Sequence, residues 1–251
     1  MDLRPPLFWS SASRTDTGKV RSHNEDACLE LPARGLWAVA DGMGGHEAGE
    51  VASTAIVSTL GEIRRPPTLR SFVDEVEDRL LACNAQLRRL ANSRGRNQII
   101  GATVVVLLTY GKLAVYLWAG DCRLYRCRQG NLVQLTQDHT QVEEMVTRGL
   151  LARADTRRHP NANVVTRAVG ARDAVFLDVD AEPVEIGDRF LLCSDGLDKE
   201  LEDNEIRDIL VDGEDTEVVN TLIDLALSRK GRDNITVVAA TAHLATNQPG
   251  G

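Results

Sequence analysis

Apolar residues recur along the chain with two different periods, and this pattern predicts both helices and strands. Helical spacing, with apolar residues returning every three or four positions, is found over four stretches: 47–60, 68–95, 203–210 and 216–228. Thr68 is a candidate N-cap for the second helix, because its hydroxyl can accept a hydrogen bond from a free backbone N–H. Gly95 is a candidate stop at the other end of that helix.

Short apolar runs between glycine-containing turns predict strands. They read GLWAVA, GATVVVLLT, KLAVYLWA, CRLYRCR, LVQLT, AVFLDVD, DRFLLCS and NITVVAATA. Four of these runs lie between residues 101 and 136 with only a few residues separating them. We therefore expect antiparallel neighbours, because a parallel crossover needs a dozen or more residues. The strand GLWAVA is expected to end at Asp41.

Three stretches lack this strong patterning. We expect an arm at the N-terminus and a flexible tail over about 246–251, which leaves a single domain, 1–251, with a core over about 12–243. Residues 136–170 are polar, so we expect a surface excursion there with a short helix near 142–147.

The run GKVRSHNEDACLEL alternates loosely, as a strand does. That alternation predicts Arg21, His23 and Glu25 on one face, where Arg21 could bind a phosphate and Glu25 and Asp26 could add carboxylates to a site. Taken alone, RSHNED is more typical of a charged strand in contact with solvent.

Composition excludes several classes of protein. Of the 251 residues, 43% are hydrophobic and 26% are charged, as in ordinary globular proteins and unlike disordered or fibrous chains. The net charge of −8, with only scattered basic pairs, argues against a nucleic-acid partner. Apolar runs are too short to span a bilayer and the N-terminus lacks a signal-peptide pattern, so we expect a cytoplasmic protein without membrane insertion. Five scattered cysteines predict neither a disulfide framework nor a zinc site.

Four aspartates stand next to predicted strands. Asp41 and Asp195 follow strands and precede glycine, whereas Asp121 and Asp233 precede strands. In antiparallel sheets the end of one strand lies beside the start of its neighbour, so these carboxylates could converge at one edge. Like charges so close together favour a divalent cation, and oxygen-only ligands favour Mg²⁺ or Mn²⁺ over zinc.

The carboxylate pattern also has an ordinary explanation. Asp-Gly is among the commonest turn dipeptides, so spacing alone does not separate a metal site from two turns. A calcium-binding loop is disfavoured, because the acidic stretch DGLDKELEDNE lacks the alternation of an EF-hand.

Taken together and in order, eight stretches show a family pattern. They read TDTGKVRSHNEDA, VADGMGGHEAGEVAS, GATVVVL, AGDCRLYR, LTQDHTQVEEMVTRG, HPNANVVTRAVG, LLCSDGL and GRDNITVV. This pattern resembles the type 2C metal-dependent serine/threonine phosphatases, in particular their compact bacterial branch. The resemblance runs from about Thr15 to Val238 and implies an α+β fold, a four-layer α-β-β-α sandwich of two antiparallel sheets with a metal centre at one edge.

The resemblance assigns metal ligands by position. It implies that Asp41 bridges two Mn²⁺ or Mg²⁺ ions and that the Gly42 carbonyl binds the second ion. Asp195 and Asp233 match ligands of the first ion. Asp121, together with Asp195, matches the aspartate that holds a third, weaker ion.

Other residues receive supporting roles from the same resemblance. Arg21 matches an arginine that binds the substrate phosphate, and Glu25 and Asp26 match acids that bind or orient metal waters. Residues 139–170 match a mobile flap that helps select protein substrates. The implied reaction is hydrolysis of phosphoserine and phosphothreonine by a metal-activated water, with no covalent phosphoenzyme.

Three positions depart from the family pattern. Met43 stands where eukaryotic relatives often carry a histidine proposed as the acid, and His46 does not inherit that role. Cys122 replaces a common serine; a buried small residue and an oxidisable thiol are both open there. Lys199 replaces an aspartate, so no metal role passes to it or to the neighbouring Asp198.

The partners follow from this reading. We expect phosphoproteins as substrates, a cognate serine/threonine kinase as the opposing enzyme and a monomeric state. An alternative is a phosphatase-like binding or scaffold protein with little turnover; degenerate relatives of that kind lose metal carboxylates, which this chain keeps.

Overall fold

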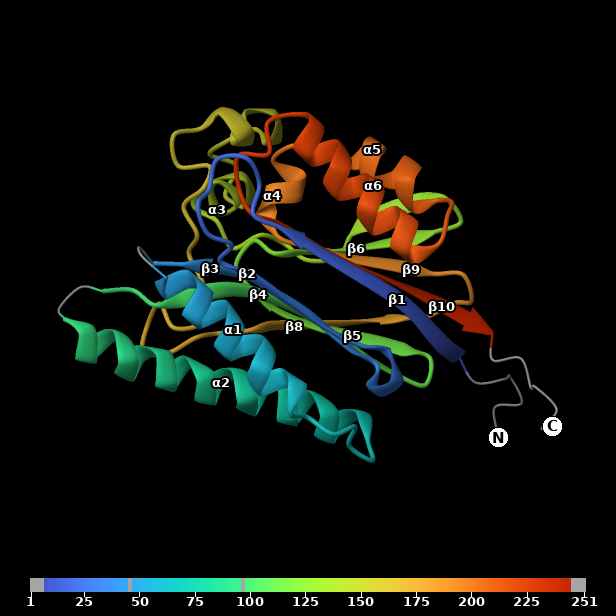
Figure 1. The fold of residues 1–251 in the computed structure, drawn as a ribbon, viewed down its shortest axis with the longest axis horizontal. Coiled ribbons are helices and arrows are strands. Elements are labelled where there is room, and N and C mark those ends of the chain that lie inside the picture. The colour runs from blue at the N-terminus through green and yellow to red at the C-terminus, as the bar shows by residue number, and fades with distance from the viewer. Residues whose placement is uncertain (1–6, 45–46, 96–97, 245–251) are drawn as a thin grey trace.

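Two five-stranded antiparallel sheets pack face to face, with helices on both outer faces (Figure 1). The computed structural model describes residues 7–44, 47–95 and 98–244, so the predicted tail over 246–251 lies outside the described part. One sheet has the order β1 (Leu7–Asp16), β10 (Ile235–Leu244), β9 (Arg189–Cys193), β6 (Arg123–Arg128) and β7 (Asn131–Gln134). The other has the order β2 (Asp26–Leu31), β3 (Leu36–Met43), β4 (Gly101–Tyr110), β5 (Leu113–Ala119) and β8 (Asp178–Pro183). These layers confirm the predicted α-β-β-α sandwich.

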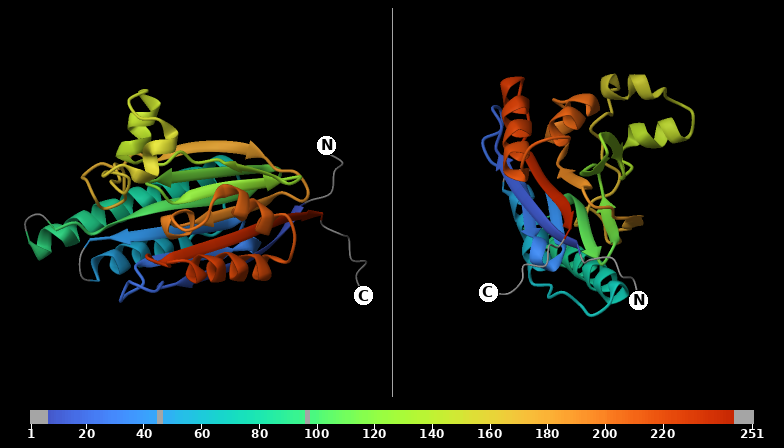
Figure 2. Two further views of the ribbon diagram at one scale, coloured as in Figure 1. Left: turned by 90° about the horizontal axis from the view of Figure 1, so that it is seen from above. Right: turned by 90° about the vertical axis from the view of Figure 1, so that its right-hand side faces the viewer.

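The helices divide between the two outer faces. The β3 sheet is covered by α1 (Ala48–Gly61) and α2 (Leu69–Arg94), and the β9 sheet by α5 (Asp203–Leu210) and α6 (Asp215–Ser228), as Figure 2 shows. The short helix α4 (Asp195–Asp198) follows β9 directly, and a single 3₁₀ turn, η1 (Pro32–Arg34), joins β2 to β3. No helix in the described ranges is both long and apolar enough to cross a membrane.

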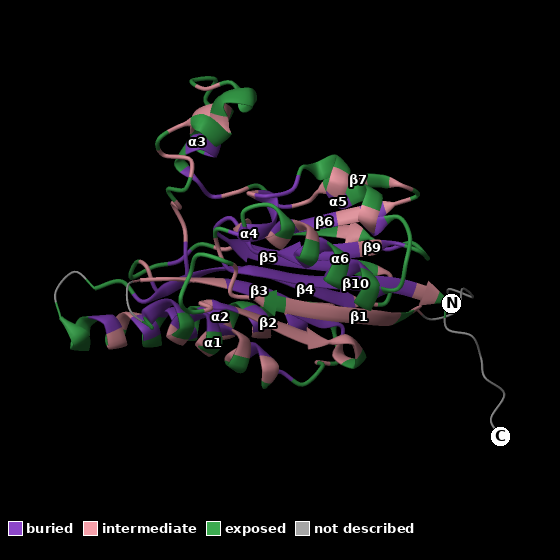
Figure 3. Cartoon of the chain, turned by 45° about the horizontal axis from the view of Figure 1, so that its top comes forward, coloured by how far each residue is buried: buried purple, intermediate pink, exposed green. Residues whose placement is uncertain are grey.

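Alternation along the central strands builds three layers of core. In β3, Ala38 and Ala40 face the helices α1 and α2, whereas Trp37 and Val39 face the opposite sheet. Strand β4 divides its side chains in the same way. Because both faces of these strands are buried, the strands read as continuous apolar runs in the sequence (Figure 3).

The predicted ends of α2 agree with the structure. The Thr68 hydroxyl accepts a hydrogen bond from the Ser71 backbone N–H at 3.1 Å, which forms an N-cap. Gly95 follows the last helical residue with φ of 135°, a conformation that favours glycine.

The N-terminal segment is a strand, and the prediction of an arm was wrong. Strand β1 pairs with β10 over its whole length, from Leu7 opposite Leu244 to Asp16 opposite Ile235. It is an edge strand with mostly half-buried residues, and its sequence LFWSSASRTD therefore carries polar residues that hide the strand pattern.

The prediction of antiparallel neighbours was wrong for the two strands that Gly120 and Asp121 connect. The hairpin partners β4 and β5 are antiparallel, as are β6 and β7, but β5 and β6 belong to different sheets. Gly120 has φ of 116°, and a Cβ there would lie 2.3 Å from the Thr103 Cβ. The chain thus passes between the sheets at a point that only glycine fits, and this passage places Asp121 at the sheet edge.

The polar excursion leaves the sandwich between β7 and β8. It contains α3 (Gln141–Thr147) and the 3₁₀ helix η2 (Arg153–Arg158), and Figures 2 and 3 show it standing away from the sheets. Strand β8 starts at Asp178, later than the run AVFLDVD predicted. We refer to residues 137–177 as the β7–β8 segment.

Candidate active site

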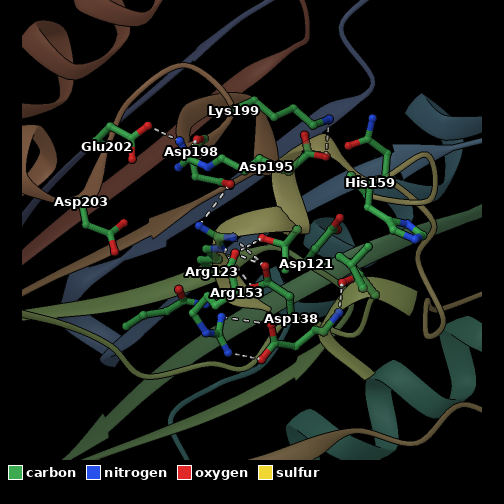
Figure 4. A pocket seen from close by; sticks show the side chains of 18 of the residues that line it. Asp121, Arg123, Asp138, Arg153, His159, Asp195, Asp198, Lys199, Glu202 and Asp203 are labelled. Carbon is green, nitrogen blue, oxygen red and sulfur yellow. Dashed lines mark hydrogen bonds and ion pairs between the residues drawn. The ribbon is translucent and has the colours of Figure 1, made fainter. Parts of the chain in front are cut away.

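A cavity of about 1210 Å³ lies between the β7–β8 segment and the end of the β9 sheet. Its wall includes Asp121, Asp195 and Asp233, three of the aspartates predicted as ligands. Arg21, the predicted phosphate-binding residue, lines the same cavity. Figure 4 shows Asp195, Asp121 and Asp138 in this pocket, one below the other in the view.

Strand register explains why these acids meet. Cys193, the last residue of β9, pairs with Val237 of β10 on one side and with Arg123 of β6 on the other. Asp195 therefore leaves β9 at the end of the sheet where β6 and β10 begin. Asp121 and Asp233 precede those two strands, so they reach the same edge, as the sequence predicted.

Asp41 approaches this edge from the other sheet. It pairs with Asp26 of β2 and Thr103 of β4, and β3 continues to Met43, so Asp41 lies within the strand rather than at its end. Burial, followed by the charges of Asp26 and Asp195, raises the pKa of Asp41 well above its usual range. A buried carboxylate among other carboxylates needs a cation to remain ionised at neutral pH.

Gly42 allows three segments to pack closely. Its backbone N–H donates to the Glu25 carbonyl at 3.1 Å. A Cβ on Gly42 would lie 2.2 Å from the Gly49 carbonyl oxygen and 2.5 Å from the Glu25 carbonyl oxygen. The Glu25 side chain packs on α1, because a Cβ at Gly49 would lie 2.7 Å from Glu25 Oε1.

Asp26 is held in a fixed orientation by two hydroxyl groups. Ser194 Oγ donates to Asp26 Oδ2 at 2.7 Å, and Thr236 Oγ1 donates to the same oxygen at 2.8 Å. Burial raises the pKa of Asp26, and these two hydrogen bonds oppose that shift only partly. Neither hydroxyl residue was identified from the sequence, because each belongs to a strand end whose partner is set by the packing of the two sheets.

The segment carrying Arg21 is a loop, so the predicted strand face of Arg21, His23 and Glu25 was wrong. Residues 17–25 connect β1 to β2. Asn234 fixes this loop: its side chain donates to the Thr17 carbonyl at 2.8 Å and to the His23 carbonyl at 2.9 Å, and accepts from the Glu25 N–H at 2.8 Å. The loop is therefore anchored through its backbone, and its polar side chains do not form one strand face.

Two cationic side chains contact Asp233. Arg21 Nε lies 2.8 Å from Asp233 Oδ1, and Lys199 Nζ lies 3.0 Å from Asp233 Oδ2 and also contacts Asp195. Burial by itself would raise the pKa of Asp233, but Lys199 and Arg21 together outweigh it and lower that pKa. In Asp195, burial prevails over Lys199 and raises the pKa.

Arg123 organises the pocket floor and was not identified from the sequence. Its guanidinium binds Asp138 at 2.6 Å and Asp198 at 3.1 Å, and donates to the Tyr125 hydroxyl at 3.0 Å. Burial raises the pKa of Asp198 to about 7 in spite of Arg123. The network joins β6 to α4, which fixes the turn that carries Asp195.

The donor set fits a hard divalent cation. One oxygen of Asp195, Oδ1, is buried without a hydrogen-bond partner, so it is free to accept a further cation. The surrounding donors are oxygens, which suit Mg²⁺ and Mn²⁺. Within the described ranges, no three His, Cys, Asp or Glu side chains form a compact cluster. Asp26 is held by hydroxyl groups and Asp233 by cationic side chains.

Two of the positions that depart from the family pattern, Cys122 and Met43, lie in the described part of the chain. Cys122 is buried against Thr103, with Sγ and Oγ1 3.1 Å apart, and burial raises the pKa of its thiol well above the usual range. Met43 is the last residue of β3. His46 lies outside the described residues.

Comparison with known proteins agrees with this geometry. A family model described as protein phosphatase 2C matches residues 17–222. The chain belongs to the protein phosphatase 2C family. The match spans the loop of Arg21, the strand of Asp41 and the turn of Asp195.

Two curated members of the protein phosphatase 2C family show the range of chain lengths. The serine/threonine protein phosphatase PstP of Mycobacterium tuberculosis is 34% identical over 237 residues, which are 94% of this chain and 46% of PstP. This chain thus spans about half the length of PstP. The serine/threonine phosphatase stp of Listeria welshimeri is 34% identical over 239 residues, 92% of this chain and 95% of that protein.

Solved structures of protein phosphatase 2C relatives share the whole sandwich. PppA, described as a key regulatory component of T6SS in Pseudomonas aeruginosa, matches with a TM-score of 0.88 at 43% identity, covering 94% of this chain and 98% of PppA. The PstP catalytic domain in complex with two manganese ions matches with a TM-score of 0.84 at 31% identity, covering 94% of this chain and 99% of that domain.

Proposed function

We propose that this chain hydrolyses phosphoserine and phosphothreonine in proteins, using two divalent cations, Mn²⁺ or Mg²⁺. The observation that carries the proposal is the buried oxygen Oδ1 of Asp195, which has no hydrogen-bond partner, beside Asp41, whose pKa is raised by desolvation and by the neighbouring carboxylates. The manganese-bound structure of PstP supports the choice of cation. When bound, the cations supply activation of a water and neutralisation of charge at the phosphoryl group.

The ligand assignments remain those of the sequence. Asp41 would hold both cations and the Gly42 carbonyl would contact one of them. Asp195 and Asp233 would complete one site. Asp121 lies beside Asp195, and its pKa is raised by burial and then by Asp195, so a third cation there is part of the proposal.

The chain's own residues position the substrate. Arg21 lines the cavity with about half of its side chain exposed, so its guanidinium can reach a phosphate oxygen while it stays near Asp233. Asp26 is oriented by Ser194 and Thr236 and can orient a water at the centre. We propose a contact of the same kind for Glu25, whose backbone carbonyl accepts from the Gly42 N–H.

A cysteine-based phosphatase mechanism does not fit this chain. Burial raises the pKa of the thiol in each of its five cysteines. A nucleophilic cysteine needs the opposite shift, because the thiolate is the reactive form. Direct attack by water therefore fits the residues better than a covalent phosphocysteine.

The cellular partners are proposed by analogy with the relatives. Phosphorylated proteins are the proposed substrates, and a eukaryotic-like serine/threonine kinase in the cytoplasm is the proposed opposing enzyme. The β7–β8 segment, as the predicted flap, would contact the protein substrate beside the cavity. We further propose that the chain acts as a monomer, and regulation of a secretion system is one setting, given the description of PppA.

Phosphate release from a phosphothreonine peptide tests the function. We expect turnover with Mn²⁺, loss of turnover in excess EDTA and full recovery when Mn²⁺ is restored, because the cations activate the attacking water. A matched phosphotyrosine peptide serves as the control for substrate class. Turnover that persists after complete removal of metal would contradict the proposal.

A further inference from the structure

The Lys199 ammonium lies between two predicted metal ligands. Nζ is 3.0 Å from Asp233 Oδ2. It also contacts Asp195 Oδ2, and Figure 4 shows Lys199 reaching over Asp195. Lys199 comes four residues after Asp195, directly after α4, so the helix turn brings its side chain back over that carboxylate. About a quarter of the side chain is exposed, and it lines the cavity.

Asp233 has no oxygen left for another cation. Its Oδ1 is bound by Arg21 Nε at 2.8 Å and by the Asn234 N–H at 3.1 Å. Its Oδ2 is bound by Lys199 at 3.0 Å and by a second Arg21 nitrogen at 3.1 Å. A divalent ion that binds both Asp195 and Asp233 must therefore displace a contact already present.

Lys199 is the cationic side chain that an ion bound to both carboxylates must displace. It contacts both carboxylates, whereas Arg21 contacts only Asp233 and is about half exposed. A positive charge at this point repels a second cation, and this repulsion is stronger at a partly buried site than in water.

We propose that Lys199 is an internal cation that competes with the divalent ion for Asp195 and Asp233. Metal loading is then an exchange, in which the ammonium leaves the two carboxylates and turns into the cavity. Lys199 stabilises the metal-free protein and lowers its affinity for metal. The inference rests on the proposed function only for the identity of the two ligands.

Calorimetric titration of Mn²⁺ into the metal-stripped protein, without substrate, tests the exchange. Lys199→Met removes the charge and keeps most of the length, and we expect it to bind Mn²⁺ about tenfold more tightly or better. Lys199→Arg keeps the charge and should stay close to the wild type. Lys112→Met, in the turn between β4 and β5, removes one lysine charge away from the cavity and should leave the affinity unchanged.

Thermal unfolding provides a readout that needs no binding. The metal-stripped Lys199→Met protein should melt at a lower temperature than the wild type, because Asp195 then loses the ammonium that contacts it and Asp233 keeps only Arg21. Mn²⁺ should raise its melting temperature by more. Lys199→Gln repeats the test with a polar side chain if the Met variant does not fold. Equal or weaker Mn²⁺ binding by the uncharged variants would overturn the inference.

The binding result is separate from phosphatase activity. Tighter Mn²⁺ binding by Lys199→Met in a protein without turnover would support the inference and contradict the proposed function. Normal turnover with unchanged Mn²⁺ binding would contradict the inference and support the proposed function.

Discussion

Asp41 is the residue whose environment most demands a cation. It is half-buried, and loss of solvent, followed by the charges of Asp26, Asp195 and Asp121, raises the pKa of its carboxyl group. Ser194 and Thr236 satisfy Asp26, and Arg21 and Lys199 satisfy Asp233. Asp26 and Asp233 are thus anchored by partners within the protein. This anchoring distinguishes them from an acid that is open to a metal ion.

Gly42→Ala tests the close packing around Asp41. The new Cβ would lie 2.2 Å from a backbone oxygen of Gly49, so the segments must move apart. We expect a loss of about 1–3 kcal/mol in the free energy of unfolding, together with reduced Mn²⁺-dependent turnover. Urea denaturation and phosphate release measure the two effects.

Gly61→Ala is the matched control. It ends α1, and its Cβ would meet only Leu29 Cδ1 at 3.5 Å, an ordinary contact. The free energy of unfolding should stay the same or rise slightly, because alanine has the higher helix propensity. Equal stability losses in both variants would show that crowding at Gly42 is not the cause.

Among the elements, the base of the β7–β8 segment is fixed by one histidine. His139 Nδ1 accepts a hydrogen bond from the Gly120 N–H at 3.1 Å, and Nε2 lies 3.1 Å from Asp178, which Arg167 also binds. The ring stacks on Trp118 with 5.8 Å between centroids. His139 therefore joins the segment to β5, β8 and the passage that leads to Asp121.

The protonation of His139 predicts a loss of stability in acid. Burial lowers the pKa of His139, although Asp178 opposes the shift. The unfolded chain, with a histidine pKa of about 6.5, therefore takes up more protons than the folded chain as the pH falls below that value. The stability contributed by neutral His139 is complete above about pH 6.5 and is lost as the pH falls through the lower, folded pKa.

Denaturant unfolding at pH 7.5 and pH 5.5 measures this effect in the wild type and in His139→Asn. The variant carries no titrating imidazole, so its stability should fall less between the two pH values. An identical fall in both proteins would assign the acid sensitivity to other groups.

At the scale of the whole molecule, the layer between the two sheets holds the site together. It contains Trp37, Leu107 and Phe190 from different strands, all fully buried. The ligand candidates Asp41 and Asp195 belong to opposite sheets, so their separation depends on this layer.

Leu107→Ala would open a cavity between the sheets. We expect a loss of about 2–5 kcal/mol in the free energy of unfolding, from lost burial and incomplete collapse of the cavity. Leu150→Ala removes the same atoms from a side chain that is 69% exposed, and its effect should stay within about 0.5 kcal/mol. Urea denaturation of both variants measures the difference, and similar losses would contradict the core assignment.

Strong local patterns made much of the fold predictable. Helix α2 has a clear stripe, a cap at Thr68 and a stop at Gly95, and the central strands read as apolar runs. Strand β1 was missed because an edge strand keeps polar residues. The passage at Gly120 was misread because a short turn joins either hairpin partners or strands of two stacked sheets, and only packing distinguishes them.

The candidate site was predictable where a residue type and its place on a strand were sufficient. Asp121, Asp195 and Asp233 flank neighbouring strands, so register brings them together. The contacts of Asn234 with His23, of Lys199 with Asp233 and of Arg123 with Asp138 each join different elements of the fold. No local pattern marks them.

The most direct test of a metal-dependent phosphatase centred on Asp41 is the rate of phosphate release from a phosphothreonine peptide at saturating Mn²⁺, in wild type and in Asp41→Asn. Asp74→Asn on the exposed face of α2 controls for loss of an acid and should keep the wild-type rate. We predict rapid release by the wild type and a fall of about 10³-fold or more in Asp41→Asn, because charge stabilisation by the cations would be lost. An Asp41→Asn rate within tenfold of the wild type would contradict the account.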